Sequence, residues 1–271
     1  MSDHAPFFFD PKKLNALAER YRDQYVNADP CPHIYFDDFL PIEAAEDVLA
    51  EFPGAGVITW KNIGNEHEIK KSCENEQHIG PMARHLIAQF NSSAFVTFLE
   101  KLTGIDGLIT DSHLRGGGLH RIEKGGYLKV HLDFNWYPKL RLTRRLNILF
   151  FLNKDWKEEY GGHFELWDKD MKKAQARILP VFNRLALFAT SEESYHGHPD
   201  PLNCLEGMAR KSIALYYYTS NGTEEVQKYS TVFRPRPGED FLRGGSFSKN
   251  LIRELMPPII YKNVKKILGK K

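Results

Sequence analysis

The chain has 271 residues, of which 42% are hydrophobic and 27% are charged, which is the composition of a soluble globular protein with a large core. The 37 Lys and Arg residues almost balance the 35 Asp and Glu residues, so the net charge of +2 gives no electrostatic case for a nucleic-acid partner. No stretch of about 18 apolar residues occurs, so no membrane-spanning helix is expected.

The N-terminal part, residues 1–107, is predicted to be a helix-rich region packed on the core. Asp10-Pro11 provides an N-cap and a first-turn proline, and apolar residues then recur at helical spacing as far as Tyr25. A strand is expected over 34–40, and further helices are expected over 42–52 and 81–103. Gly104 closes the last of these helices.

From about residue 108 the pattern changes to short strands separated by glycine and Asn/Asp turns. The expected strands are 108–110, 118–123, 127–133, 145–153, 163–167, 176–179, 184–189 and 211–219. Strands of this length and spacing are typical of a β-sandwich or barrel. Gly161-Gly162 is predicted to be the turn of a hairpin. The expected fold is therefore mainly β with flanking helices (α+β), with a double-stranded β-helix, or jelly roll, over 108–220.

Residues 221–271 are predicted to be a C-terminal extension, within what is expected to be one compact unit overall. Prolines exclude a central strand over 234–238 because they remove donors from the hydrogen-bond ladder. A closing helix, interrupted at Pro257-Pro258, is expected over 249–271. The lysines near the end of the chain are predicted to form a solvated face.

The cysteines and the N-terminus indicate a cytoplasmic protein. Cys31, Cys73 and Cys204 are far apart and form no CxxC pair, which argues against a disulfide framework and a thiolate zinc site. The opening sequence Met-Ser-Asp-His-Ala-Pro lacks the basic region and apolar run of a signal peptide. The sequence leaves the oligomeric state open.

A histidine and an aspartate, His131 and Asp133, lie two positions apart in the predicted strand over 127–133. Because side chains alternate along a strand, both point to one face, and Leu128, Val130 and Leu132 are expected to point to the other. Fe(II) accepts two such ligands plus a second histidine on one face of its octahedron and keeps positions open. Two polar residues on the solvent face of a strand would look identical, so the motif needs partners elsewhere.

Two later segments provide candidate partners. An apolar strand runs into a polar loop that ends in His196-Gly197-His198, and either histidine could complete a metal site. Arg210 and Ser212 share one face of the strand that follows. An arginine beside a hydroxyl suits a carboxylate ligand, which the guanidinium can bind through two hydrogen bonds. Taken alone, Arg210 would be a surface charge at the start of a strand.

The ordered set of motifs resembles the prolyl 4-hydroxylase-like branch of the 2-oxoglutarate/Fe(II) oxygenases. The set consists of His131-x-Asp133, Gly161-Gly162, His196-Gly197 and Arg210-x-Ser212. Residues 145–153 are similar to that branch's strand before the Gly-Gly turn, and the resemblance covers roughly residues 110–220. It implies a dioxygenase that hydroxylates a C–H bond of a prolyl, peptidyl or small-molecule substrate while 2-oxoglutarate is decarboxylated to succinate.

The resemblance implies that His131, Asp133 and His196 bind the iron and form the catalytic centre. His196 is preferred to His198 because His196-Gly197 matches the His-Gly pair of the family. Dioxygen, 2-oxoglutarate and an unidentified organic substrate would be the partners of this centre. Ascorbate commonly keeps the iron reduced in relatives.

Arg210, assisted by Ser212, would bind the distal carboxylate of 2-oxoglutarate. The interval between His196 and Arg210 is a few residues longer than usual, which leaves Lys211 as an alternative. Strand parity with Ser212 favours Arg210. The other candidates for contact with the co-substrate are His120, Tyr127 and Asn147.

Two other functions fit parts of the pattern. A cupin-like metalloenzyme would not use 2-oxoglutarate, but cupins usually begin with His-x-His rather than His-x-Asp. A non-catalytic jelly-roll binding module would keep the fold alone, and the complete ligand set argues against it. Arg141, Arg144 and Arg145, in a predicted loop, would either contact an acidic substrate or, more often, be solvated.

Overall fold

The computed structural model describes residues 7–222 and 226–241. The chain divides into two compact units at Arg236, and every helix and strand of the described residues belongs to the first. The closing helix predicted over 249–271 and the terminal lysines lie outside the described residues. The predicted domain boundaries stay a prediction.

Four α-helices form in the N-terminal hundred residues. They are α1 (Pro11–Val26), α2 (Ile42–Ala50), α3 (Pro81–Phe90) and α4 (Ser93–Thr103). Asp10 caps α1 by accepting a hydrogen bond from the Lys12 amide, and Gly104 ends α4 in the left-handed conformation. None of the helices in the described part of the chain is long and apolar enough to cross a membrane.

The single helix predicted over 81–103 is wrong, because α3 and α4 are separate helices. Asn91 ends α3, and the side chain of Ser92 accepts a hydrogen bond from the Phe95 amide, which begins α4. A serine that caps a new helix offers the backbone an alternative to continuing the old one. Apolar residues recur at helical spacing on each side of the break, and the prediction joined the two runs across residues 91–94, where no large apolar residue occurs.

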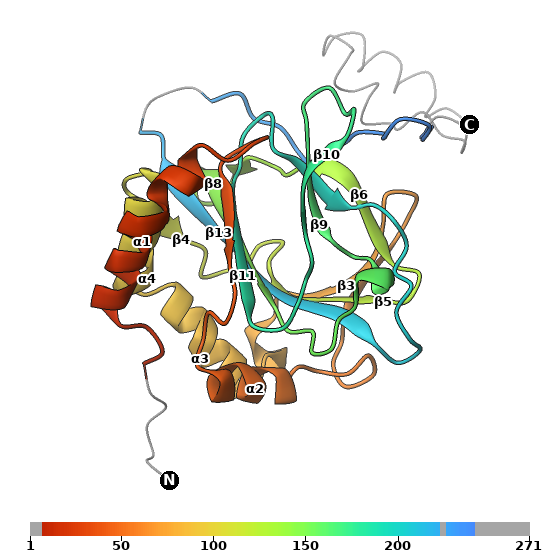
Figure 1. Ribbon diagram of the computed structural model, residues 1–271, viewed down its shortest axis with the longest axis horizontal. Coiled ribbons are helices and arrows are strands. Elements are labelled where there is room, and N and C mark those ends of the chain that lie inside the picture. Colours follow the sequence, from red (N-terminus) through yellow and green to blue (C-terminus); the bar gives the residue numbers. More distant parts are fainter. Residues whose placement is uncertain (1–6, 223–225, 242–271) are drawn as a thin grey trace, which may run out of the picture. The chain divides into compact units, whose positions relative to one another are not determined.

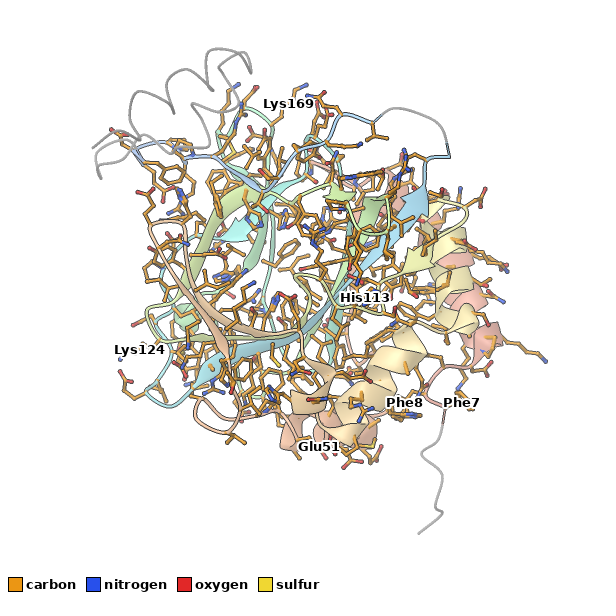
Figure 2. The ribbon with its side chains drawn as sticks, turned by 180° about the vertical axis from the view of Figure 1, so that it is seen from behind. Phe7, Phe8, Glu51, His113, Lys124 and Lys169 are labelled. Atoms are coloured by element: carbon orange, nitrogen blue, oxygen red, sulfur yellow. The ribbon has the colours of Figure 1, made fainter. Side chains whose placement is uncertain are left out.

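The four helices lie together on one side of the strands (Figure 1). Aromatic rings join them to the strands: Phe90 in α3 lies 6.0 Å from Phe150, and Phe95 in α4 lies 6.4 Å from Tyr217, between ring centroids. Each such pair contributes about 0.5–1.5 kcal/mol beyond the burial of its apolar area. Side chains fill the interior, with Phe8 on the helical side and Lys124 on the far side (Figure 2).

The strands are antiparallel throughout and form a jelly-roll core, as predicted. They are β1 (His33–Phe36), β2 (Lys61–Gly64), β3 (Glu68–Cys73), β4 (Ile109–Thr110), β5 (Gly118–Glu123), β6 (Tyr127–Leu132), β7 (Trp136–Tyr137), β8 (Leu142–Phe151), β9 (Phe164–Trp167), β10 (Ala174–Ile178), β11 (Arg184–Ala189), β12 (Tyr195–His198), β13 (Ala209–Ser220) and β14 (Val232–Phe233), with 3-10 turns at Glu76–His78 and Glu158–Tyr160. The main order of pairing is β1-β11-β8-β13-β5-β3-β6-β12-β9-β10. The strand β3 therefore joins a wall formed by β1, β11, β8, β13 and β5 to a wall formed by β6, β12, β9 and β10.

The hairpin formed by β2 and β3 was not predicted. Its sequence, residues 61–73, is polar on both faces, so it shows no alternation of apolar and polar residues that would indicate a strand.

The predicted hairpin turn at Gly161-Gly162 is wrong. The strand β8 pairs with β11, β13 and β7, whereas β9 pairs with β10 and β12, so these two glycines carry the chain from one wall to the other.

Asn183 ties the helical side to the sheet. It is 1% exposed, with a left-handed backbone at φ +59°, and it directly precedes β11. Its side-chain oxygen accepts a hydrogen bond from the Leu40 amide at 2.9 Å, and its side-chain nitrogen donates to the Leu40 carbonyl at 2.8 Å. One side chain thus satisfies two buried backbone groups just before α2.

We expect Asn183→Gly to lower the free energy of unfolding by about 2–3 kcal/mol, because two buried backbone groups lose their partners. Asn183→Ala should cost about 1 kcal/mol more, because alanine is strained in the left-handed region and glycine is not. Urea unfolding of both variants measures this difference. Equal stability of the alanine variant and the wild type would contradict the role of this residue.

Candidate metal centre and carboxylate pocket

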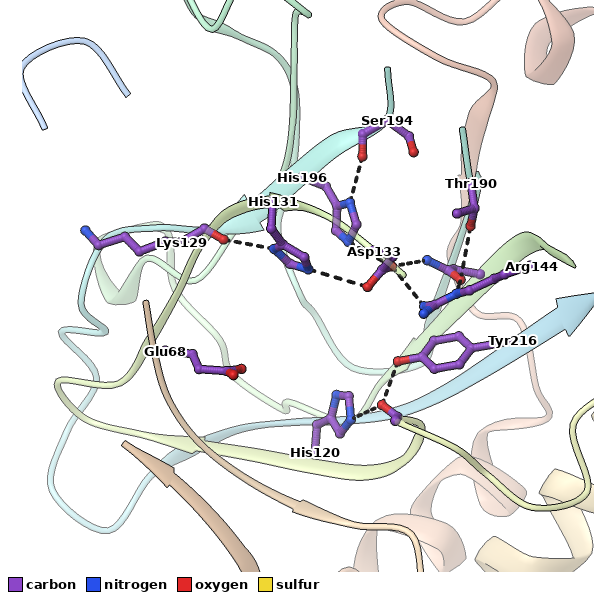
Figure 3. Close-up of polar contacts among 12 residues, drawn as sticks. Glu68, His120, Lys129, His131, Asp133, Arg144, Thr190, Ser194, His196 and Tyr216 are labelled. Carbon is purple, nitrogen blue, oxygen red and sulfur yellow. Dashed lines mark hydrogen bonds and ion pairs between the residues drawn. The ribbon is translucent and has the colours of Figure 1, made fainter. Parts of the chain in front are cut away.

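Three ligand-type side chains meet between β6 and β12. His196 on β12 lies directly opposite His131 on β6 in the antiparallel register, with the ring centroids 4.4 Å apart. Asp133 follows the end of β6. The potential ligand atoms of these three residues all lie within 4.8 Å of one another. Figure 3 shows the three side chains turned toward one another.

Backbone carbonyls orient the two imidazole rings. The Nδ1 atom of His131 lies 2.9 Å from the Lys129 carbonyl oxygen, and the Nδ1 atom of His196 lies 2.9 Å from the Ser194 carbonyl oxygen. A carbonyl can only accept, so Nδ1 carries the proton in each neutral ring and Nε2 keeps its lone pair. These Nε2 atoms lie 3.5 Å and 3.3 Å from the carboxylate oxygens of Asp133. Burial and the neighbouring His196 lower the pKa of His131, which favours the neutral form that a metal requires.

A buried arginine holds Asp133 in its ionised form. Oδ2 of Asp133 accepts hydrogen bonds from Arg144 Nη2 and Asn147 Nδ2, both at 2.8 Å. Burial alone would raise the pKa of Asp133, but the positive charge of Arg144 beside it holds this pKa well below its usual range. Arg144 also lies over the ring of Tyr216, 3.3 Å from the ring centroid.

The prediction that Arg144 lies in a loop is wrong. The strand β8 begins at Leu142, three residues earlier than expected, and Arg144 is only 2% exposed. The neighbouring charges, including Arg145, hid the beginning of this strand from a pattern search based on hydrophobicity. Leu128 also differs from its prediction, because a register shift opposite His196 and His198 leaves it lining the cavity rather than facing away.

Arg210 and Ser212 lie at the other end of the same cavity. Arg210 is 4% exposed, its Nε donates to the Gly162 carbonyl at 2.7 Å, and among the described residues no carboxylate lies within ion-pair distance. Burial lowers its pKa to about 9. The Ser212 hydroxyl and both ring nitrogens of His198 are buried without a hydrogen-bond partner in the part of the chain that the structure describes. This end of the cavity therefore carries positive charge and has hydrogen-bonding groups without a partner among the described residues.

The remaining candidates divide into those that line the cavity and those that do not. His120 lines it, and Asn147 lines it while bound to Asp133. Lys211 is absent from the lining and lies over the ring of Phe52 at 5.9 Å. The hydroxyl of Tyr127 donates to the Asn65 carbonyl at 3.3 Å, away from the cavity.

Lys70 also lines the cavity, and sequence reasoning missed it. It comes from β3, pairs with Glu68 at 2.9 Å, and is 16% exposed at its side chain. No motif marks it, because it belongs to the polar hairpin for which no strand was expected. Only the pairing of β3 with β5 and β6 brings it to this place.

The stability of the metal-free protein should fall as the pH drops from about 6.5 toward 3. Burial and the positive charge of Lys70 lower the pKa of His120 to about 3, so the unfolded chain takes up a proton that the folded chain refuses. We expect His120→Gln to reduce the pH slope of the unfolding free energy by up to about 1.4 kcal/mol per pH unit in this window. Urea titrations between pH 6 and 4.5 measure it, and an unchanged slope with an unchanged m-value would contradict the assignment.

Comparison with known proteins finds a similarity over part of the chain. Residues 117–218 match the family model described as the 2OG-Fe(II) oxygenase superfamily. No curated protein matched the chain in a sequence search.

Solved structures of low identity share the fold. A prolyl hydroxylase from Trichoplax adhaerens, in complex with a hypoxia-inducible factor peptide fragment, is 18% identical, with a TM-score of 0.53 over 76% of this chain and 91% of that one. A prolyl 4-hydroxylase from Phytophthora capsici is 17% identical, with a TM-score of 0.55 over 80% of this chain and 68% of that one. HygX from Streptomyces hygroscopicus, bound to nickel, 2-oxoglutarate and hygromycin B, is 12% identical, with a TM-score of 0.50 over 76% and 89%.

These matches confirm the resemblance predicted from the sequence: the chain is similar to the 2-oxoglutarate/Fe(II) oxygenases over residues 117–218 and has a prolyl 4-hydroxylase-like fold.

Proposed function

We propose that the protein is an Fe(II)- and 2-oxoglutarate-dependent dioxygenase that hydroxylates a C–H bond of a prolyl, peptidyl or small-molecule substrate. The observation that carries the proposal is the convergence of His131, Asp133 and His196 at the end of a cavity whose other end is cationic. Two imidazoles and a carboxylate on one face are the ligand set of non-haem Fe(II) oxygenases. Ascorbate as a reductant and a cytoplasmic location stay predictions.

The residues fit the metal in type and in orientation. His131 and His196 offer Nε2 lone pairs, and their Nδ1–H groups are held by backbone carbonyls, which fixes the rings. Arg144 and Asn147 occupy Oδ2 of Asp133 and so fix the orientation of the carboxylate. When bound, iron with 2-oxoglutarate and dioxygen supplies the oxidising chemistry, and succinate and carbon dioxide are released with the hydroxylated product.

The cationic end of the cavity fits a dicarboxylate. A buried guanidinium without a counter-ion is costly, and a bound carboxylate would supply the missing charge. Arg210 and the Ser212 hydroxyl, which has no hydrogen-bond partner among the described residues, are two donors on one strand face, suited to the two oxygens of the distal carboxylate of 2-oxoglutarate. Lys70 adds positive charge to the same cavity.

Anaerobic addition of Fe(II) and 2-oxoglutarate to the metal-free protein should produce the weak visible charge-transfer band of the iron chelate. We expect His131→Ala to lose the band, because one of the three ligands is missing. His113→Ala is the matched control, since His113 is exposed and lies outside the cavity, and it should keep the band. A folded wild-type protein that takes up iron but gives no band and no succinate would contradict the proposal.

Gly161 and Gly162 provide a matched pair that tests the carboxylate pocket. Both have a positive φ, but a Cβ at Gly162 would lie 2.6 Å from a Leu202 methyl and 3.0 Å from Arg210 Cδ, whereas a Cβ at Gly161 would meet nothing within 4 Å. We expect Gly162→Ala to weaken 2-oxoglutarate binding at least about tenfold more than Gly161→Ala, because a shifted Arg210 loses about 1.4 kcal/mol of binding free energy. Titration of the charge-transfer band measures both affinities. Equal affinities would show that Arg210 does not hold the co-substrate.

A further inference from the structure

A second pocket, here called the outer pocket, lies next to the cavity and shares His131, Asp133 and Arg144 with it. Its volume is about 240 Å³. One wall is the hairpin β2–β3, which contributes Ile63 and Glu68 among others, and Thr231 and Phe233 form another part of its lining. Both the hairpin and the segment around Phe233 lie outside residues 117–218, the part that matches the oxygenase superfamily.

Residues 227–236, here called the strap, are fixed along β6. The Asn135 side chain donates to the Gln227 carbonyl at 2.7 Å and accepts from the Tyr229 amide at 2.9 Å. Farther along, Phe233 pairs with His131 across β14 and β6, and the Arg234 amide donates to the Val130 carbonyl at 2.9 Å. The strap is therefore held at both ends, beside the strand that carries a candidate metal ligand.

The hairpin and the strap meet at one ring stack. The ring of Phe233 lies on His67 at 4.4 Å between centroids with an interplanar angle of 14°, and it lies 5.4 Å from the ring of His131. His67 is in the turn between β2 and β3, and its carbonyl accepts a hydrogen bond from the Lys129 amide at 2.8 Å. The stack thus joins two segments far apart in the sequence beside the candidate metal centre.

We propose that His67 and Phe233 form a clasp that closes this side of the outer pocket and limits its occupant to a small polar molecule, excluding a polypeptide segment. The inference rests on the proposed oxygenase function, whose substrate would occupy the outer pocket. An extended peptide needs a groove that is open at both ends, whereas here the hairpin and the strap are joined. A volume of about 240 Å³ is below the range of about 300–1,000 Å³ typical of drug-sized ligand sites.

The lining of the outer pocket is charged and therefore favours a polar occupant. Glu68 pairs with Lys70, and Glu74 lies 3.7 Å from Lys61, so charges of both signs line the walls. Nη1 of Arg144 is buried and has no hydrogen-bond partner among the described residues. A polar ligand can supply partners for the charged groups of this lining, whereas an apolar ligand would bury them without any.

The clasp is tested by the capture of iron from the anaerobic Fe(II)-loaded protein by bathophenanthroline disulfonate, a chelator too bulky for the outer pocket. In the wild type we expect a capture rate that does not depend on chelator concentration, because iron must leave on its own. In Phe233→Ala the rate should rise with chelator concentration and exceed the wild-type rate by about tenfold, because the loss of the ring contact opens the clasp.

Val232→Ala is the matched control, on the same strand but with a 41% exposed side chain, and it should behave as the wild type. A concentration-dependent rate in the wild type, or the same acceleration in Val232→Ala, would overturn the proposal.

Hydrogen exchange of the metal-free protein tests the clasp independently of iron. Phe233→Ala and, separately, His67→Ala should each speed amide exchange in both the hairpin, residues 61–73, and the strap. If Phe233→Ala left amide exchange in the hairpin unchanged, or His67→Ala left it unchanged in the strap, the clasp would be overturned even in a protein that binds iron. Failure to take up iron, with coupled exchange intact, would instead remove the oxygenase proposal and leave the clasp standing.

Discussion

The antiparallel pairing of β6 with β12 is the constraint on which the candidate site depends. It places His196 directly across from His131, although 65 residues separate them in the sequence. Asp133 needs only to follow β6 to complete the group. The two outer neighbours of this pair, β3 beside β6 and β9 beside β12, keep both strands in the interior of the sheet. Since a slip of one residue would turn either histidine to the other face, the register itself determines which side chains form the candidate ligand set.

The two ends of the cavity differ in net charge, and this difference indicates what each end can bind. At the end with the three candidate ligands, Asp133 and Arg144 neutralise each other within 2.8 Å, and removing one partner of such a buried pair typically costs about 3–5 kcal/mol. At the other end, Arg210 has a backbone carbonyl as its hydrogen-bond partner and no carboxylate among the described residues. Because this pair carries no net charge, a divalent cation bound by the two histidines and Asp133 would keep positive charge for an anionic co-substrate. An uncompensated guanidinium suits an anion.

The outer pocket and the cavity are lined in part by different segments of the chain. The cavity is lined mainly from β5, β6, β8, β12 and β13, which lie within the superfamily match, whereas the outer pocket also takes residues from β2, β3 and the strap. Neither segment has a hydrophobic pattern of its own that would hold it in place. Backbone hydrogen bonds to β6, and the contact between His67 and Phe233, hold them instead. Differences in substrate among proteins that share the jelly roll can therefore arise from such additions without a change to the metal ligands.

The sequence by itself determined the fold class, because apolar alternation, glycine turns and helix caps are local signals. Spacing on a strand also indicated His131 with Asp133, and Arg210 with Ser212, as candidate site residues, whereas the choice of His196 over His198 came from the resemblance to a known family. The sequence named Arg144 only as a residue of a predicted loop, solvated or in contact with an acidic substrate, and it could not indicate Lys70 or the strap. Arg144 lies within a run of charges that conceals a strand, and Lys70 lies in a hairpin that is polar on both faces. Long-range pairing alone brings these residues to the site, and pairing between distant strands depends on complementary surfaces rather than on any local pattern.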